Sequence, residues 1–254
     1  MGPVFSFFAV GICYGASHER WLRPHMLIKI LVTFLFGGIV GLDTTAAWQV
    51  LFSHPLISCS LIGLAFGEPQ MGLFFGIIFE LIWFYDMPMG GARFPEGNVG
   101  SFLGLMLLLT FQDIPDIPDG WLLLIGIVYT VAASYLFGAT IVWMRKQNLK
   151  LVLRADRSAA EGDAQKVGRM HRLGVLHAYL HGAVWSLLLY LPGILAVRLA
   201  LPLIRRMRPL NVEMLQTLML GVGMAVMFQL FLSRRRGWHL LLGFLCGLGL
   251  AWVS

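Results

Sequence analysis

Eight apolar runs, several of them shorter than a full membrane span, constrain the fold of this chain more than any other feature. They fall at about residues 26–42, 50–66, 71–85, 98–111, 121–144, 173–197, 212–233 and 237–253. Only 13% of the residues are charged, roughly half the fraction of a soluble domain, so an aqueous fold cannot hide this apolar surface. A helix crosses a bilayer with about 20 residues. We therefore expect an all-α, polytopic integral membrane helical bundle with short and broken helices. Whether some of these helices re-enter the membrane is left open.

The positive charge is concentrated in one segment. Residues 145–172 hold eight Lys and Arg against three Asp and Glu, which accounts for +5 of the formal net charge of +6. Basic segments stay on the cytoplasmic side, so we expect a basic cytoplasmic loop at 145–172 and the Asp-Pro segment 112–120 outside. The loop is either a solvated connector near anionic membrane lipids or a docking surface for a cytosolic partner. The remaining chain has too few polar residues to build a nucleic-acid surface, which excludes that partner.

Two segments leave the topology open. Arg198, Arg205, Arg206 and Arg208 follow the run at 173–197, although one crossing from the basic loop places them outside. Either that run re-enters the membrane, or these side chains reach headgroups at the interface. Residues 1–24 lack the features of a cleaved signal peptide and are interpreted as an N-terminal extension or an extra short membrane segment. Residues 25–254 then form one membrane domain.

The runs between residues 50 and 111 are interrupted by glycine and proline. The breaks fall at 67–69, at Pro88, at 90–91 and at 95–97. Broken backbone is tolerated at membrane depth only where it is buried in protein or lines a cavity. Transporters build substrate sites from such discontinuous helices, so we expect a site here.

Ionisable residues lie inside or beside these broken runs. Glu80 has apolar or glycine neighbours on both sides, so its carboxyl group must be protonated, paired or bound to a polar solute. It either binds a solute or makes a structural hydrogen bond to another helix. Asp43 and Gln49 stand at run ends beside His54, where capping and interface roles compete with binding.

The segment 90–97 offers both main-chain and side-chain hydrogen-bonding groups. Gly90 and Gly91 expose backbone amides, Pro95 fixes a turn, and Glu96 supplies a carboxylate that Arg93 is placed to neutralise. Such a loop suits a polyol, although an ordinary interfacial turn has the same composition. His177 and His181 are one helical turn apart but have no evident third ligand, so packing is favoured over a metal site. No arrangement of side chains indicates covalent catalysis, and no metal or cofactor is expected.

Residues 53–104 resemble the membrane IIC subunit of the mannose/fructose/sorbose family of the sugar phosphotransferase system (PTS). The matching positions follow the family's motifs in order; they are His54-Pro55-Leu56, Leu61 through Glu68, Gly76 with Glu80, Met89 through Ala92, and Pro95-Glu96. Weaker similarity runs from Gly41-Leu42-Asp43 to the C-terminus. Three departures affect substrate choice, because Glu96 replaces the usual Asp, His54 replaces the usual Arg, and Arg93 adds a cation.

The resemblance implies a sugar permease subunit in a bacterial plasma membrane that binds a hexose or amino sugar and moves it inward. It implies a IID membrane subunit, cytosolic IIA and IIB proteins that relay phosphate from phosphoenolpyruvate, and an oligomeric assembly. The subunit itself carries no catalytic residue in the family. The implied substrate-binding residues are Glu80, Gly90, Gly91, Ala92, Pro95 and Glu96, with Asp43, Gln49 and His54 near them.

Two other functions fit the residues. A secondary transporter of another small solute would use Glu80 and Asp43 as proton or cation sites. A non-transporting membrane anchor or sensor would use the basic loop to recruit cytosolic partners.

Overall fold

The computed structural model describes residues 26–84, 95–114, 117–231, 242 and 245. Within these ranges the elements are all helices, which confirms the all-α prediction, whereas residues 1–24 lie outside the description. The helices are α1 (Met26–Thr45), α2 (Pro55–Ala65), α3 (Pro69–Trp83), α4 (Gly97–Phe111), α5 (Asp119–Ala160), α6 (Ala164–Ile204) and α7 (Val212–Phe231). In the described part of the chain, α1, α5, α6 and residues 212–229 of α7 are long and apolar enough to cross a membrane.

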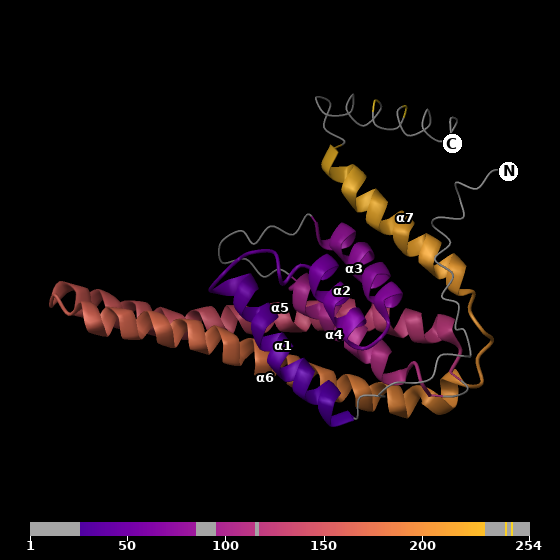
Figure 1. The fold of residues 1–254 in the computed structure, drawn as a ribbon, viewed down its shortest axis with the longest axis horizontal. Coiled ribbons are helices and arrows are strands. Elements are labelled where there is room, and N and C mark those ends of the chain that lie inside the picture. The colour runs from indigo at the N-terminus through magenta and orange to yellow at the C-terminus, as the bar shows by residue number, and fades with distance from the viewer. Residues whose placement is uncertain (1–25, 85–94, 115–116, 232–241, 243–244, 246–254) are drawn as a thin grey trace.

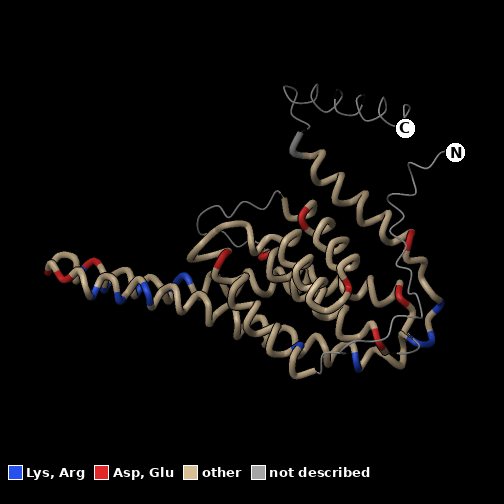
Figure 2. The backbone as a smooth tube through the Cα atoms, in the orientation of Figure 1, with Lys and Arg blue, Asp and Glu red and all other residues tan. Residues whose placement is uncertain are grey.

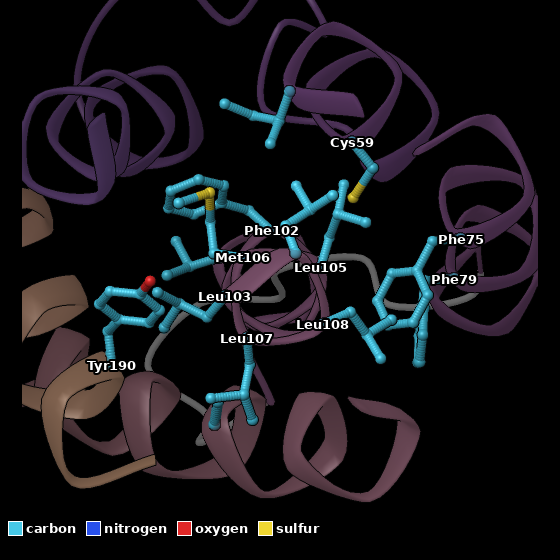
Figure 3. Packing of buried hydrophobic residues seen from close by; sticks show 14 of the residues in the cluster. Cys59, Phe75, Phe79, Phe102, Leu103, Leu105, Met106, Leu107, Leu108 and Tyr190 are labelled. Carbon is cyan, nitrogen blue, oxygen red and sulfur yellow. The ribbon is translucent and has the colours of Figure 1, made fainter. Parts of the chain in front are cut away.

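The three short helices occupy the middle of the molecule. Helix α2 has 11 residues and helices α3 and α4 have 15 each, too few for a full span. Side chains of α4 radiate to all sides, toward Tyr190 of α6 on one side and Phe75 and Phe79 of α3 on the other (Figure 3). Nearly every residue of α4 is buried, so this short helix is the packing centre of the bundle.

Proline and glycine explain why α2 and α3 form a short hairpin. Each helix starts with proline at its first position, where the missing N–H has no intrahelical partner to lose. The two helices then meet at Gly63 and Gly72, where a Cβ added to either glycine falls within 2.7 Å of the other's Cα. This close approach, typical of helix pairs in membranes, requires glycine at both positions.

The long helices α5 and α6 form an antiparallel pair that extends beyond the rest of the molecule (Figure 1). The exposed Trp143 lies about 33 Å along the helix axis from Trp121, close to the thickness of a bilayer core flanked by interfacial tryptophans. Beyond Trp143, α5 continues for about 25 Å. Residues 145–172, which we call the α5–α6 arm, are therefore two helical segments joined at 161–163, and they carry the basic side chains (Figure 2).

Helix α6 settles one of the two topological alternatives. It runs without a break from Ala164 to Ile204, through Pro192 and Pro202, so the run at 173–197 does not re-enter. Arg198 and Arg205 lie toward the end of α6 that is opposite the arm. There the Trp121 indole N–H donates to the Arg208 carbonyl at 2.8 Å, which joins this end to the start of α5.

Candidate functional site

The centre of the candidate site is a hydrogen-bonded pair of ionisable side chains. His54 Nδ1 lies 2.7 Å from Glu80 Oε1. The other carboxylate oxygen, Oε2, accepts the backbone N–H of Leu56 at 3.2 Å. The His54 side chain is 42% exposed and that of Glu80 is 21% exposed, so one edge of the pair is open to a ligand.

The α2–α3 hairpin brings these two residues together. His54 immediately precedes α2, and Glu80 lies near the end of α3, which runs back beside α2. Gly76, one turn before Glu80, permits the contact, since a Cβ there would meet the Pro55 carbonyl oxygen at 2.8 Å. Glu80 thus faces the first turn of α2, where backbone N–H groups and the helix dipole both favour a carboxylate.

Asp43 lies at the end of α1 and is 2% exposed. Its Oδ1 accepts the backbone N–H of Val50 at 3.0 Å, and its Oδ2 accepts the backbone N–H of Ser53 at 2.8 Å. Both donors belong to the segment that leads into His54. Asp43 is therefore next to the His54–Glu80 pair in the fold, with each of its oxygens bonded to main chain.

A third carboxylate approaches from α4. The Glu96 backbone N–H donates to the Ser134 carbonyl of α5 at 2.8 Å, and the Glu96 carbonyl accepts from Gly100 at the start of α4. Two residues on, Asn98 bonds Ser53, which directly precedes His54, so the start of α4 lies beside the His54–Glu80 pair. His54 therefore lies among three carboxylates that come from α1, α3 and the start of α4.

Contacts with α5 place this site at membrane depth. Ser134, which holds the Glu96 backbone, lies between the two interfacial tryptophans, about 20 Å along α5 from Trp121 and about 14 Å from Trp143.

A cavity of about 410 Å³ lies elsewhere, at the start of α5, and is lined by Asp119, Gly120 and Leu210 among others. That cavity contains none of the expected site residues.

The expected residues divide into three groups. Asp43, His54, Glu80 and Glu96 are brought together, and Pro95 is half-buried directly before Glu96. Gln49 is exposed, in the segment that Asp43 holds. Gly90, Gly91 and Ala92, with the neighbouring Arg93, lie outside the described residues.

The structure adds residues that the sequence analysis did not select. Asn98 Nδ2 donates to Ser53 Oγ at 3.4 Å, linking α4 to the segment before His54. The Trp83 ring packs on Gly97, where an added Cβ would collide with it. Lys29 lies apart from the site, about 21 Å along α1 from Asp43; it is 8% exposed and donates to the Leu109 carbonyl of α4 at 2.5 Å. A lysine inside an apolar run is a visible signal, whereas Asn98 and Trp83 have none in the sequence.

His177 and His181 have separate surroundings. His177 Nδ1 lies 2.6 Å from Asn148 Oδ1 on α5, and His181 packs against the Phe137 ring. Among the described residues, no group of three His, Cys, Asp or Glu side chains is arranged to hold a metal ion.

The arrangement suits a neutral ligand with several hydroxyl groups. Carboxylates accept hydrogen bonds from hydroxyls, and such charge-assisted bonds are stronger than neutral ones. An imidazole paired with one carboxylate oxygen keeps its other ring nitrogen for a further hydrogen bond. The open edge of the His54–Glu80 pair therefore supplies both donor and acceptor capacity at membrane depth.

Comparison with known families gives a match over almost the whole chain. Residues 27–251 match the family described as the sorbose-specific IIC component of the PTS. The sorbose-specific EIIC component of Lacticaseibacillus casei is 31% identical over 107 residues, covering 42% of this chain and 36% of the relative. The fructose permease IIC component of Bacillus subtilis is 24% identical over 172 residues, covering 67% of this chain and 60% of the relative. The matched part is less than two thirds of either relative's length.

Two solved structures share the fold. One is described as a membrane protein, with a TM-score of 0.63 at 20% identity, and the alignment covers 87% of this chain and 86% of the other. The second is a cryo-electron-microscopy structure of the mannose transporter ManYZ in complex with a microcin. It gives a TM-score of 0.54 at 18% identity, with the same 87% and 86% coverage.

Proposed function

Because the chain belongs to the family of sorbose-specific IIC components of the PTS, we propose that it is the sugar permease subunit of such a system. It is a multi-pass membrane protein. In this role it binds a hexose or amino sugar within a bacterial plasma membrane and moves it inward, where partner subunits phosphorylate it. The chain contributes binding and translocation, and the phosphoryl transfer takes place on other proteins.

The observation that carries this proposal is the half-open His54–Glu80 pair at membrane depth. Placing a charged side chain at this depth costs about several kcal/mol of insertion free energy unless it is paired or hydrogen-bonded. A pair that only joined two helices would not need an exposed edge. The exposed edge, beside helices interrupted by glycine and proline, supports a binding role for polar solutes.

Partner subunits are part of the proposal. Among the described residues of α7 only Gly223 is buried, so most of that apolar helix is available to lipid or to a IID membrane subunit in an oligomeric complex. The α5–α6 arm combines exposed basic side chains with the exposed Leu149, Val152 and Leu153. Because the arm extends past the level of Trp143, we propose it as the landing site for the cytosolic IIA and IIB proteins.

Sugar binding to the purified protein tests the proposal. The chain, reconstituted in lipid nanodiscs with and without its IID subunit, is titrated with sorbose, fructose, mannose and N-acetylgalactosamine. We expect saturable binding of at least one of these sugars. If both the chain and the IID subunit are folded and none of these sugars binds saturably, the assignment is contradicted. Binding that requires a proton or sodium gradient favours the secondary transporter instead.

A further inference from the structure

The segment between α1 and α2, residues 46–53, has an unusual backbone. Trp48, Gln49 and Leu51 have φ angles of 66°, 52° and 67°. Residues with a side chain rarely adopt this left-handed region, and three within four positions are uncommon. The side chains of Trp48 and Leu51 are mostly exposed, so burial of those groups does not hold the backbone in place. Some other contact must stabilise it.

The buried carboxylate of Asp43 makes two such contacts, beside the packing of Phe52 on Phe36 and the bond of Asn98 to Ser53. It accepts the N–H groups of Val50 and Ser53, which lie on both sides of Leu51. The carboxylate offers one acceptor oxygen to each of these two backbone donors and adds no donor of its own. At 2% exposure Asp43 has almost no surface left for a solute. Its role in the described structure is therefore directed at the main chain.

The held segment ends on the site residue His54. Ser53, which donates to Asp43, directly precedes it, and the His54 N–H donates to the Leu51 carbonyl at 3.1 Å. On the other side, the His54 carbonyl accepts from Ile57 and Ser58 in the first turn of α2. The position of the imidazole thus depends on the segment before it and on the helix after it.

We propose that Asp43 is a positioning residue for the site: it holds the strained backbone of residues 46–53 so that His54 meets Glu80, and it does not itself bind the sugar. The reference to a sugar rests on the proposed function, whereas the positioning of His54 does not. Direct binding of a sugar by Asp43 would require its oxygens to exchange their backbone donors for sugar hydroxyls.

The first test needs no sugar. In protein with ¹⁵N-labelled histidine, the nuclear magnetic resonance signal of the His54 imidazole is identified by its loss in His54→Gln. Glu80→Gln then shows how this signal changes when the His54–Glu80 pair is broken. Asp43→Asn keeps the side-chain shape but places an amide NH₂ against one of the two backbone donors. We expect Asp43→Asn to shift the His54 signal in the same direction as Glu80→Gln. Thr45→Val, a control that removes a hydroxyl bonded within α1, leaves the signal unchanged.

Hydrogen exchange gives a second reading on the same protein. Backbone amides of 46–55 should exchange faster in Asp43→Asn than in the wild type or in Thr45→Val, because one of the two bonds is lost. An unchanged His54 signal in an Asp43→Asn protein that retains its thermal unfolding midpoint overturns the proposal, whether or not a sugar binds. So does unchanged exchange over residues 46–55.

A double-mutant cycle then separates positioning from direct contact. The probe is the sugar bound best by the wild type among sorbose, fructose, mannose and N-acetylgalactosamine. We expect Asp43→Asn to raise the Kd by about tenfold in the wild-type background, as loss of a buried hydrogen bond does, but by less than about twofold in the His54→Gln background. An equal loss in both backgrounds overturns the positioning role. If no sugar binds to the wild type, the proposed function fails while the histidine signal still decides the role of Asp43.

Discussion

At the residue scale, Glu80 shows how one half-buried acid joins two elements. One oxygen faces His54 at the end of the segment from α1, and the other accepts from Leu56 in the first turn of α2. Both contacts use the acceptor capacity of a carboxylate, and the exposed edge leaves further capacity for a ligand. The side chain is therefore a structural link, and in the proposed function it is also a binding group.

Glu80→Gln tests the binding role of this side chain. Gln has the same size but presents an NH₂ group where one acceptor oxygen was, so a charge-assisted bond to the sugar is lost. Such bonds contribute about 1.5–3 kcal/mol, which corresponds to roughly 10- to 100-fold weaker binding. Titration of the reconstituted variant measures the change. Glu213→Gln, at the exposed start of α7, serves as the control and should bind as the wild type does.

Unchanged sugar affinity in Glu80→Gln, with normal insertion and unfolding, would remove Glu80 from the binding site.

How far single residues are predictable depends on the range of their contacts. Glu80 stands out in the sequence because an acid inside an apolar run needs a partner. Its partner His54 is 26 positions away, and only the geometry of the α2–α3 hairpin brings the two within hydrogen-bonding distance. The hydrogen bonds of Asp43 are harder still to predict from the sequence, because they depend on left-handed backbone at residues that do not normally favour it.

At the element scale, the apolar runs from 26 to 233 each overlap a described helix, whereas the run at 237–253 lies almost wholly outside the described residues. The short runs became α2, α3 and α4, and the breaks at 67–69 and 95–97 separate these helices, as glycine and proline indicated. The full length of α5 and α6 was not predicted. The basic segment 145–172 contains no apolar run of membrane-spanning length, so it was expected to be a loop. Its two helical segments lie side by side beyond the rest of the molecule (Figure 1), and that pairing is a tertiary contact.

Gly63→Ala tests the packing of the α2–α3 hairpin. The new methyl group would lie 2.6 Å from the Glu68 carbonyl oxygen and from Gly72 Cα, so the helices must separate. Overpacking of this kind costs about 1–3 kcal/mol, which should lower the thermal unfolding midpoint by several degrees. Because His54 and Glu80 lie at the far end of the same hairpin, sugar affinity should fall as well.

Gly174→Ala is the matched control for this experiment. Nothing lies within 4 Å of a Cβ added at Gly174, so this variant should keep the affinity of the wild type and a midpoint equal to or slightly above it, because Ala favours the helix. A Gly63→Ala protein as stable as Gly174→Ala would show that the close contact of α2 with α3 is not required.

At the scale of the whole molecule, charge and length together predict the orientation. The arm and the Asp119 end of the α5–α6 pair lie on opposite sides of the apolar span, and the arm holds most of the net charge. Arg198 to Arg208 at the opposite end reduce this asymmetry, but Asp119 lies at the same end, two residues before Trp121, whose indole bonds the Arg208 carbonyl. The larger excess on the arm favours its cytoplasmic placement.

Thiol labelling tests this orientation. In a background with Cys13, Cys59 and Cys246 changed to Ala, one cysteine is placed in the arm by Ala160→Cys or at the other end of α5 by Asp119→Cys; both positions are exposed. A membrane-impermeant maleimide added to intact cells should label the second variant only. Inside-out vesicles should reverse the pattern. Labelling of Ala160→Cys in intact cells would place the arm outside and exclude it as a landing site for cytosolic proteins.

The central claim is that the sugar bound beside His54 and Glu80 crosses the membrane in a phosphoenolpyruvate-coupled system. The most direct measurement is the chemical state of the transported sugar in right-side-out vesicles that contain the chain and its IID subunit. The vesicles are loaded with phosphoenolpyruvate and the phosphate-relay proteins, including IIA and IIB. We expect accumulation of sugar phosphate that stops without phosphoenolpyruvate and falls strongly in Glu80→Gln. Accumulation of unmodified sugar that needs an ion gradient and no phosphoenolpyruvate would contradict it.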